Sequence, residues 1–230
     1  MALADDLKAQ VSKIFREAWA DRAGMVVPDP ADLKLSNDAV TLERATILYA
    51  DLSGSTNLVN ESSWQFAAEI YKAYLYCAAK LVRDAGGVIT SYDGDRIMGV
   101  FIGDRQSTNA VRCGLKINYA VQQIINPALA NQYNTAYSVK QVVGIDTTII
   151  RAARTGVRGD NDIVWVGRAA NYAAKLTDLK LAERTWVTKA VYDMMHQEVK
   201  VTNGNNMWKQ YSWTQQNNEP IYGSTWWWVI

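Results

Sequence analysis

Residues 44–56 read Arg-Ala-Thr-Ile-Leu-Tyr-Ala-Asp-Leu-Ser-Gly-Ser-Thr, and the rest of the chain is interpreted around this segment. Residues 45–50 have the length and the Thr, Ile and Tyr content of a buried strand. Asp51 ends that strand, and the small residues that follow let a backbone turn sharply and approach a ligand closely. A helical pattern begins at about Ser62. This order of strand, acid, loop and helix is typical of a metal-phosphate site, although the same residues also serve as ordinary helix caps.

The composition is that of one globular domain with or without appendages, with 230 residues of which 49% are apolar. Lys and Arg number 24 and Asp and Glu 23, which argues against a nucleic-acid partner because such surfaces carry a basic excess. Cys77 and Cys113 are interpreted as buried free thiols, and the single histidine, His196, excludes a multi-histidine metal site. Residues 1–19 mix charges throughout, and no apolar run reaches ~18 residues, which predicts a cytoplasmic protein without a membrane span.

Hydrophobic periodicity predicts an α+β protein. The expected elements are an amphipathic helix at 2–22, a linker or irregular cover at 23–43, a strand at 45–50, a helix at 62–85, a hairpin of strands at 88–92 and 97–102, a helix at 106–125, a strand at 138–145, a polar loop at 151–161, a strand at 162–166, a helix at 168–176, a strand at 185–188, a short helix at 189–196 and one or two terminal strands. This order matches the ferredoxin-like β-α-β-β-α-β plan, an antiparallel sheet with helices on one face.

The same pattern divides the chain into three parts. An N-terminal helix and linker occupy 1–40, a central domain occupies 41–200, and a Trp-rich C-terminal extension at 201–230 packs on that domain. A helix at 2–22 with one apolar face needs a surface to cover that face, and we expect this surface to belong to the domain or to a partner chain.

A second acid, Asp95, lies in the turn of the predicted hairpin. Because the strands that carry Asp51 and Asp95 are neighbours in this plan, both carboxylates can reach one point. Two carboxylates, a backbone carbonyl such as that of Leu52, and substrate phosphates suit Mg²⁺ or Mn²⁺. An Asp-Gly-Asp turn by itself is an ordinary solvated turn. Its pairing with Asp51 indicates two-metal chemistry that activates a hydroxyl and neutralises a triphosphate.

At this point the chain resembles a known family. Residues 47–56 resemble the first metal motif of class III nucleotidyl cyclases, and residues 94–101 resemble their second metal motif. Gly144-Ile145-Asp146 resembles their mid-domain Gly-Ile strand, and residues 167–176 resemble their Gly-x-x-x-Asn-x-Ala-x-Arg helix start. Four motifs in the family's order make this a specific match.

The resemblance implies a head-to-tail homodimer whose sites combine Asp51 and Asp95 of one chain with Asn171 and Lys175 of the other. Two Mn²⁺ or Mg²⁺ ions on the acids would activate the ribose 3′-hydroxyl for attack on the α-phosphate, with release of pyrophosphate. Asn171 would orient the ribose, and Lys175 would stabilise charge in the transition state. The expected substrate-binding residues are Tyr49, Ser53, Gly54, Ser55, Thr56, Ser91, Arg154 and Arg168.

The chain departs from the family pattern at the transition-state position. Lys175 stands where the family has Arg, so the charge is kept and the planar bidentate fork is lost. Arg168, Arg154 or Arg158 could supply a guanidinium instead.

A second set of departures concerns the base. Ser91 and Val164 stand where adenine-reading cyclases have Lys and Asp, and Tyr49 replaces a common Phe. These changes resemble the pyrimidine cyclases of Pycsar antiphage systems, which implies UTP as the favoured substrate and cUMP as the product. The alternatives are a cytidylate or adenylate cyclase, or a weakly active nucleotide-binding module with the cyclase fold. A polymerase-type domain would need a basic template surface that the charge balance does not indicate.

Overall fold

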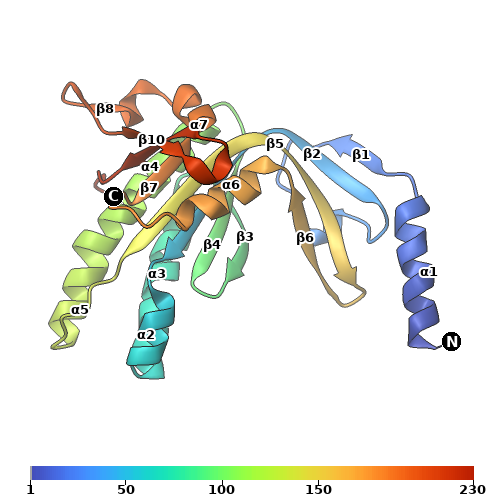
Figure 1. The fold of residues 1–230 in the computed structure, drawn as a ribbon, viewed down its shortest axis with the longest axis horizontal. Coiled ribbons are helices and arrows are strands. Elements are labelled where there is room, and N and C mark those ends of the chain that lie inside the picture. Colours follow the sequence, from blue (N-terminus) through green and yellow to red (C-terminus); the bar gives the residue numbers. More distant parts are fainter. Residues whose placement is uncertain (1) are drawn as a thin grey trace.

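The structure, a computed structural model, describes residues 2–230 (Figure 1). Within this range the main sheet has nine strands in the order β10-β11-β7-β5-β2-β4-β3, with β1 paired to β2 and β6 paired to β5. β5 pairs in parallel with β7 and β1 with β2, whereas β2 is antiparallel to both β4 and β5. The predicted α+β class is confirmed, with a mixed sheet.

The elements have the following bounds. The helices are α1 (Leu3–Arg16), α2 (Ser55–Glu61), α3 (Trp64–Asp84), α4 (Gln106–Tyr119), α5 (Asn126–Gln132), α6 (Arg168–Thr177) and α7 (Lys189–Met194), with a π-helical turn at Ala120–Ile125 and 3-10 turns at Pro30–Asp32, Gln197–Val199 and Thr214–Gln216. The strands are β1 (Ala20–Ala23), β2 (Asp38–Leu52), β3 (Val88–Asp93), β4 (Arg96–Phe101), β5 (Gln141–Val157), β6 (Asp160–Val166), β7 (Thr185–Thr188), β8 (Val201–Thr202), β9 (Asn205–Asn206), β10 (Lys209–Trp213) and β11 (Glu219–Ser224).

Helices cover both faces of the central strand β2. Leu48 and Ala50 lie in a buried cluster with residues of α3, α4 and α7. Ile47, on the opposite face, lies in a second cluster with Ala173 of α6. The continuous apolar run of β2 is explained by this burial on both sides. The sheet therefore has helices on one face, as predicted, and in addition α6 on its other face.

The predicted helix at 2–22 is shorter than expected, because α1 ends at Arg16. The side-chain amide of Asn37 donates hydrogen bonds of 2.8 Å to the carbonyls of both Ile14 and Glu17, which closes the C-terminal end of the helix. The chain then pairs as β1 with the start of β2. The prediction of a linker over 23–43 was wrong from Asp38 onward, since β2 begins there.

Two predicted helices have different boundaries. Ser62 is extended and Ser63 caps α3 by accepting a hydrogen bond from the Phe66 amide, so a separate helix, α2, precedes it. The helix predicted at 106–125 continues to Gln132 through the π turn. Proline lacks an amide donor, and Pro127 is tolerated because it lies at the start of α5, just after this wider turn.

The predicted strand at 138–145 and polar loop at 151–161 were wrong in extent. β5 runs from Gln141 to Val157 and forms a hairpin with β6 that projects from the body of the molecule (Figure 1). The polar residues that suggested a loop lie on exposed positions of this two-stranded hairpin. Gly144-Ile145-Asp146 consequently lies inside β5 and not at its end.

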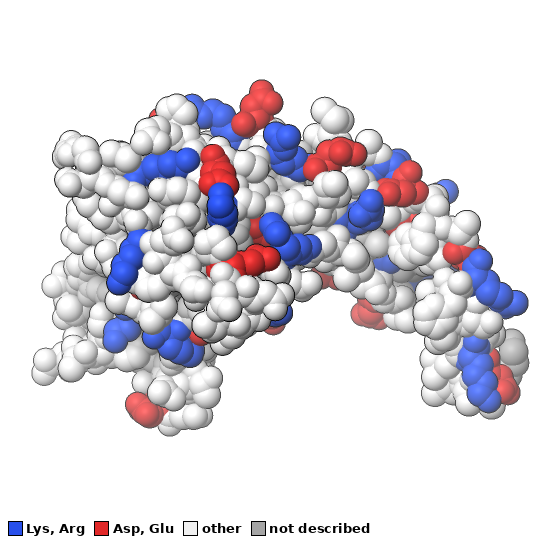
Figure 2. Space-filling model, turned by 45° about the horizontal axis from the view of Figure 1, so that its top comes forward, with Lys and Arg blue, Asp and Glu red and all other residues white. Residues whose placement is uncertain are grey.

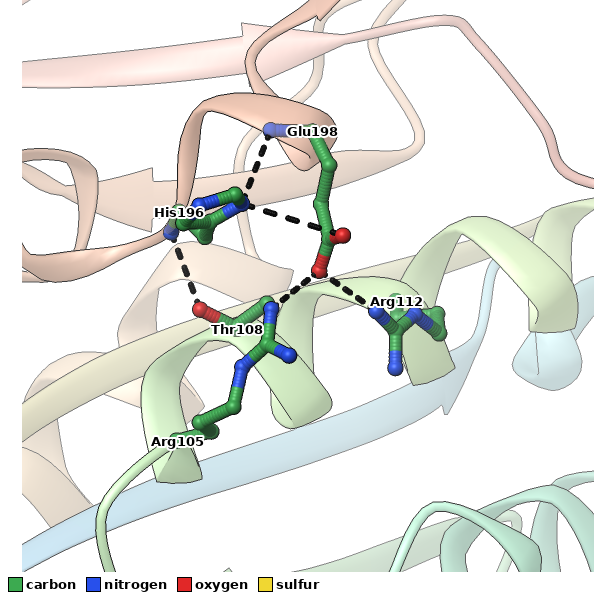
Figure 3. A network of polar contacts seen from close by, with 5 residues as sticks. All are labelled: Arg105, Thr108, Arg112, His196 and Glu198. Atoms are coloured by element: carbon green, nitrogen blue, oxygen red, sulfur yellow. Dashed lines mark hydrogen bonds and ion pairs between the residues drawn. The ribbon is translucent and has the colours of Figure 1, made fainter.

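A polar network attaches the C-terminal part of the chain to α4 (Figure 3). Glu198 accepts hydrogen bonds from Arg105 and, at 2.6 Å, from Arg112, while the amide of His196 donates to the Thr108 hydroxyl at 2.9 Å. β10 and β11 extend the main sheet beyond β7. Among residues 2–230, no helix is long and apolar enough to cross a membrane.

Candidate active site

Asp51 lies at the C-terminal end of β2, in the middle of the sheet. It pairs with Arg96 of β4 on one side and with Val142 of β5 on the other. Gly54 follows in the left-handed conformation with φ of 77°, which reverses the chain into α2. The strand, acid and glycine turn that the sequence predicts are therefore present, and the helix that follows starts at Ser55.

Asp95 comes from the neighbouring hairpin. Gly94 has φ of 60° and places Asp95 at the turn, directly before the Arg96 that pairs with Asp51. Burial and then the negative field of Asp95 raise the pKa of Asp51 to about 6. The structure thus brings the two carboxylates into one electrostatic environment. Asp178, just after α6, adds a smaller effect of the same sign on Asp51, and the sequence analysis did not identify it.

This donor set fits a divalent cation. A carboxylate such as Asp51, whose pKa is raised by burial and by a neighbouring negative charge, is stabilised in its charged form when a cation lies beside it. Among the described residues, no three His, Cys, Asp or Glu side chains form a group that could hold a metal ion. A metal at Asp51 and Asp95 would therefore complete its shell with oxygens of the backbone, water or substrate, as Mg²⁺ and Mn²⁺ do.

The pKa of Asp51 predicts an effect on metal-free stability. The pKa in the folded state, about 6, lies above the ordinary value of 3.8, so ionisation of Asp51 destabilises the folded protein as pH rises through this range. We expect Asp51→Asn to raise the melting temperature in EDTA at pH 8, but not at pH 4 where both side chains are neutral. The gain should be about 1 kcal/mol, since solvent screens a half-exposed carboxylate.

Differential scanning fluorimetry checks this expectation at the two pH values. Asp104→Asn, an exposed acid beyond the other end of β4, is the matched control. An equal change in melting temperature at pH 4 and pH 8 would contradict the assignment of the effect to Asp51 ionisation.

Arg96 is a site residue that the sequence analysis missed. Its guanidinium lies 5.2 Å from the ring centroid of Tyr49 and donates to Asp93 at 2.8 Å, while its Nε is buried and has no partner within the described chain. Burial opposes its charge, but the Asp93 hydrogen bond and the field of Asp51 outweigh this effect and raise its pKa. The sequence contained a signal for this residue. Arg96 directly follows the turn acid Asp95 and therefore begins the strand that lies beside Asp51.

Tyr49 and Ser91 lie on one row across the sheet. Both pair with Met98, Tyr49 from β2 and Ser91 from β3, so their side chains lie on the same face. Burial raises the pKa of Tyr49, which keeps its hydroxyl protonated. The row provides hydroxyl groups next to the Arg96 guanidinium.

Two predicted arginines are occupied elsewhere. Arg168 donates from Nε and Nη2 to the fully buried carboxylate of Asp146, at 3.1 and 3.3 Å, and Asp146 also accepts from Thr188. Arg154 lies far along β5 and donates to Asn161 at 2.8 Å and to the Leu33 carbonyl at 3.1 Å. In one chain, therefore, Arg154 does not lie near Asp51, and Arg168 stabilises the start of α6.

Asn171 and Lys175 lie one turn apart on the exposed side of α6. The opposite side of this helix rests directly on β5, because a Cβ atom at Gly144 would come 2.1 Å from the Ala173 carbonyl oxygen. This packing fixes the direction of Asn171 and Lys175 away from the sheet that carries Asp51 and Asp95. One chain thus holds two separate halves of the predicted site.

The loop residues have mixed environments. The Ser53 amide donates to the Lys140 carbonyl at 2.8 Å, so that group is already paired. Ser55 begins α2, with Thr56 exposed in its first turn. The single histidine, His196, belongs to the network on α4 described above (Figure 3).

The architecture of this site defines a class of protein. The chain has the fold of the adenylyl cyclase CyaB from P. aeruginosa, with a TM-score of 0.68 at 19% identity over 80% of this chain and 95% of that one. A bacterial light-regulated adenylyl cyclase gives a TM-score of 0.65 at 18% identity, over 79% of this chain and 89% of that one. The fold is that of the class III nucleotidyl cyclase catalytic domain.

Sequence relatives then identify the family. The chain is 51% identical to a uridylate cyclase of Burkholderia cepacia and 47% identical to one of Xanthomonas perforans, each alignment covering 100% of both chains. It is 36% identical to a uridylate cyclase of Rhodovulum sp. (strain MB263), over 99% of this chain and 98% of the relative. No family model matches the chain. The chain belongs to the family of these proteins, and it is a class III nucleotidyl cyclase, a phosphorus–oxygen lyase.

Proposed function

We propose that this cyclase converts UTP to 3′,5′-cyclic UMP and pyrophosphate at sites shared between two copies of the chain. The observation that carries the proposal is the separation of the two halves of the site. Asp51 and the turn residue Asp95 come from the neighbouring strands β2 and β4 beside the Tyr49–Arg96 pair, and Asp95 acts electrostatically on Asp51, whereas Asn171 and Lys175 point outward from α6. Relatives at 36–51% identity that are named uridylate cyclase support the choice of UTP.

In this mechanism the ribose 3′-hydroxyl gives up its proton to solvent water, its oxygen bonds to the α-phosphorus, the bond from that phosphorus to the bridging oxygen breaks, and pyrophosphate leaves. Bound Mn²⁺ or Mg²⁺ would supply positive charge to the attacking hydroxyl and to the phosphates. Asp51, Asp95 and the carbonyl of Leu52 are the residues that would hold two such ions. Asn171 of the second copy orients the ribose, and its Lys175 places a cation at the α-phosphate.

The donors near Tyr49 favour uracil over cytosine. An arginine side chain can only donate hydrogen bonds, and it matches a carbonyl oxygen but not an amino group. Uracil has a carbonyl at position 4, whereas cytosine and adenine have amino groups at their corresponding edges. The Arg96 guanidinium, with hydroxyls of Tyr49 and Ser91 on the same face, therefore suits UTP.

A product assay with each nucleoside triphosphate and Mn²⁺ tests the proposal. We expect cyclic UMP to be the main product, detected by chromatography and mass spectrometry. Cyclic CMP or cyclic AMP alone would overturn the base assignment while the cyclase chemistry stands. The absence of any cyclic product would favour a nucleotide-binding module with this fold.

Substitution of Tyr49 tests base recognition separately. We expect Tyr49→Phe to lower kcat/KM for UTP about tenfold, which corresponds to one hydrogen bond of ~1.4 kcal/mol. The dependence on Mn²⁺ concentration should not change, because the hydroxyl does not contact the carboxylates in this proposal. Tyr119→Phe, whose ring packs against Trp227, is the matched control. An unchanged ratio of UTP to CTP turnover would remove Tyr49 from the base pocket.

The biological role is proposed from the resemblance alone. The similarity to pyrimidine cyclases of Pycsar systems suggests that the cyclic nucleotide acts as a second messenger in antiphage defence.

A further inference from the structure

α1 is a helix without a partner. Along Leu3–Arg16 no residue is buried, and only its C-terminal end is attached, through Asn37. The apolar side chains of Leu3, Leu7, Val11, Ile14 and Phe15 fall on one side of the helix, and each is exposed by between 44% and 84%. An isolated helix of this length is marginally stable in water. Its apolar side therefore requires a cover.

A second uncovered apolar surface lies on α3 and α5, at the end of the molecule opposite α1 (Figure 1). A groove of about 310 Å³ lies between α3 and the segment formed by the π turn and α5. Ile70, Ala73 and Cys77 line one wall, and Ile124, Ala128 and Leu129 line the other. Small residues such as Ala73 and Ala128 let a helix approach closely, and such grooves bind the apolar side of amphipathic helices.

These two surfaces cannot meet within one chain but can meet between two. The molecule is an arch, with α1 at one end and α3 and α5 at the other (Figure 1). At the narrow end of the arch, which carries α1, the charged atoms lie mainly on the outer side. The side that faces the hollow of the arch shows no charged atoms in this view (Figure 2). A twofold axis through the hollow would exchange the ends of the arch and would place α1 of each copy at the α3–α5 end of the other.

We infer that α1 of one copy binds in the α3–α5 groove of a second copy and holds the cyclase dimer together. This inference rests on the two-chain site proposed above, and it adds a contact outside that site. Covering the apolar side chains of one helix removes roughly 500 Å² from water, so the two helices alone contribute roughly 1,000 Å², and the groove walls and the shared site add to this toward the ~1,600 Å² of a standard interface. The occupant of the groove is thus a segment that the chain itself supplies.

Cys77 provides a direct test, since it lies in the groove as a free thiol, whereas Cys113 is fully buried. We expect Val11→Cys to form a covalent dimer with Cys77 under mild oxidation, seen as a doubled mass on a non-reducing gel. Lys13→Cys, on the opposite side of α1, is the matched control and should remain monomeric on the gel. The double variant Val11→Cys with Cys77→Ser should also fail to cross-link.

Three outcomes separate this inference from the shared site. Cross-linking that persists without Cys77 means that α1 helices pair with each other, which overturns the inference. If sedimentation shows a dimer but no cross-link forms, α1 lies elsewhere, which overturns the inference and leaves the shared site intact. A monomer that retains full cyclase activity overturns both.

A second variant measures the same contact without oxidation. We expect Phe15→Asp to weaken dimerisation at least 100-fold in sedimentation, because a charge would enter an apolar groove. Phe15 is 84% exposed in the single chain, so folding should be unaffected. Lys13→Asp is the control, and equal dimer affinities of the two variants would contradict the inference.

Discussion

We expect Asp51→Asn and Asp95→Asn each to reduce cyclase turnover by at least about a thousandfold while the protein remains folded. In the proposed mechanism, each carboxylate would hold a cation that supplies positive charge to the attacking hydroxyl and the phosphates. The loss of one ligand removes several kcal/mol of transition-state stabilisation. Burial and then the negative field of Asp95 raise the pKa of Asp51 to about 6, so a cation beside Asp51 would relieve an unfavourable charge.

Turnover should be measured at saturating UTP and across a range of Mn²⁺ concentrations, with metal binding measured separately by calorimetry. In both variants metal affinity should fall together with activity. Asp104→Asn should behave as the wild type, because its side chain is exposed beyond the other end of β4. Wild-type activity in either site variant would refute the two-metal proposal.

Mixed dimers should regain activity when the two chains are broken in opposite halves of the site. Asp51→Ala and Lys175→Ala chains are each expected to be nearly inactive alone. In a heterodimer, one site receives the intact Asp51 of one chain and the intact Lys175 of the other. Random pairing of equal amounts should restore about a quarter of the wild-type activity, since half of the dimers are mixed and each has one working site.

The control for this experiment is a pair broken in the same half. Mixing Asp51→Ala with Asp95→Ala chains leaves every site defective, and no activity should return. Coexpression with two affinity tags isolates the heterodimer and shows that it forms. If the isolated heterodimer of Asp51→Ala and Lys175→Ala chains stays inactive, Asp51 and Lys175 do not act in one shared site.

The fold was predictable where local signals were strong. The hairpin that carries Asp95 lies within one residue of its predicted strands, since alternation and the Gly94 turn act over a few residues. The long β5–β6 hairpin was missed because its stability comes from pairing between exposed strands and not from an apolar pattern. The π turn that joins α4 to α5, and so allows the helical segment to continue through Pro127, likewise has no sequence signal of its own.

The juxtaposition of the two carboxylates could be predicted from the sequence, because strand order places Asp51 and Asp95 on neighbouring strands, and their oxygens are of the type that the proposed metal ions prefer. The other charges that join them depend on tertiary packing. Arg96 stacks on Tyr49, whereas Arg168 is held by the buried Asp146, and these pairings depend on packing between segments distant in sequence. The direction of Asn171 and Lys175 was also decided in three dimensions, by the close contact of α6 with Gly144. Residue types are encoded locally, but the direction of a side chain is set by what packs against the other side of its helix.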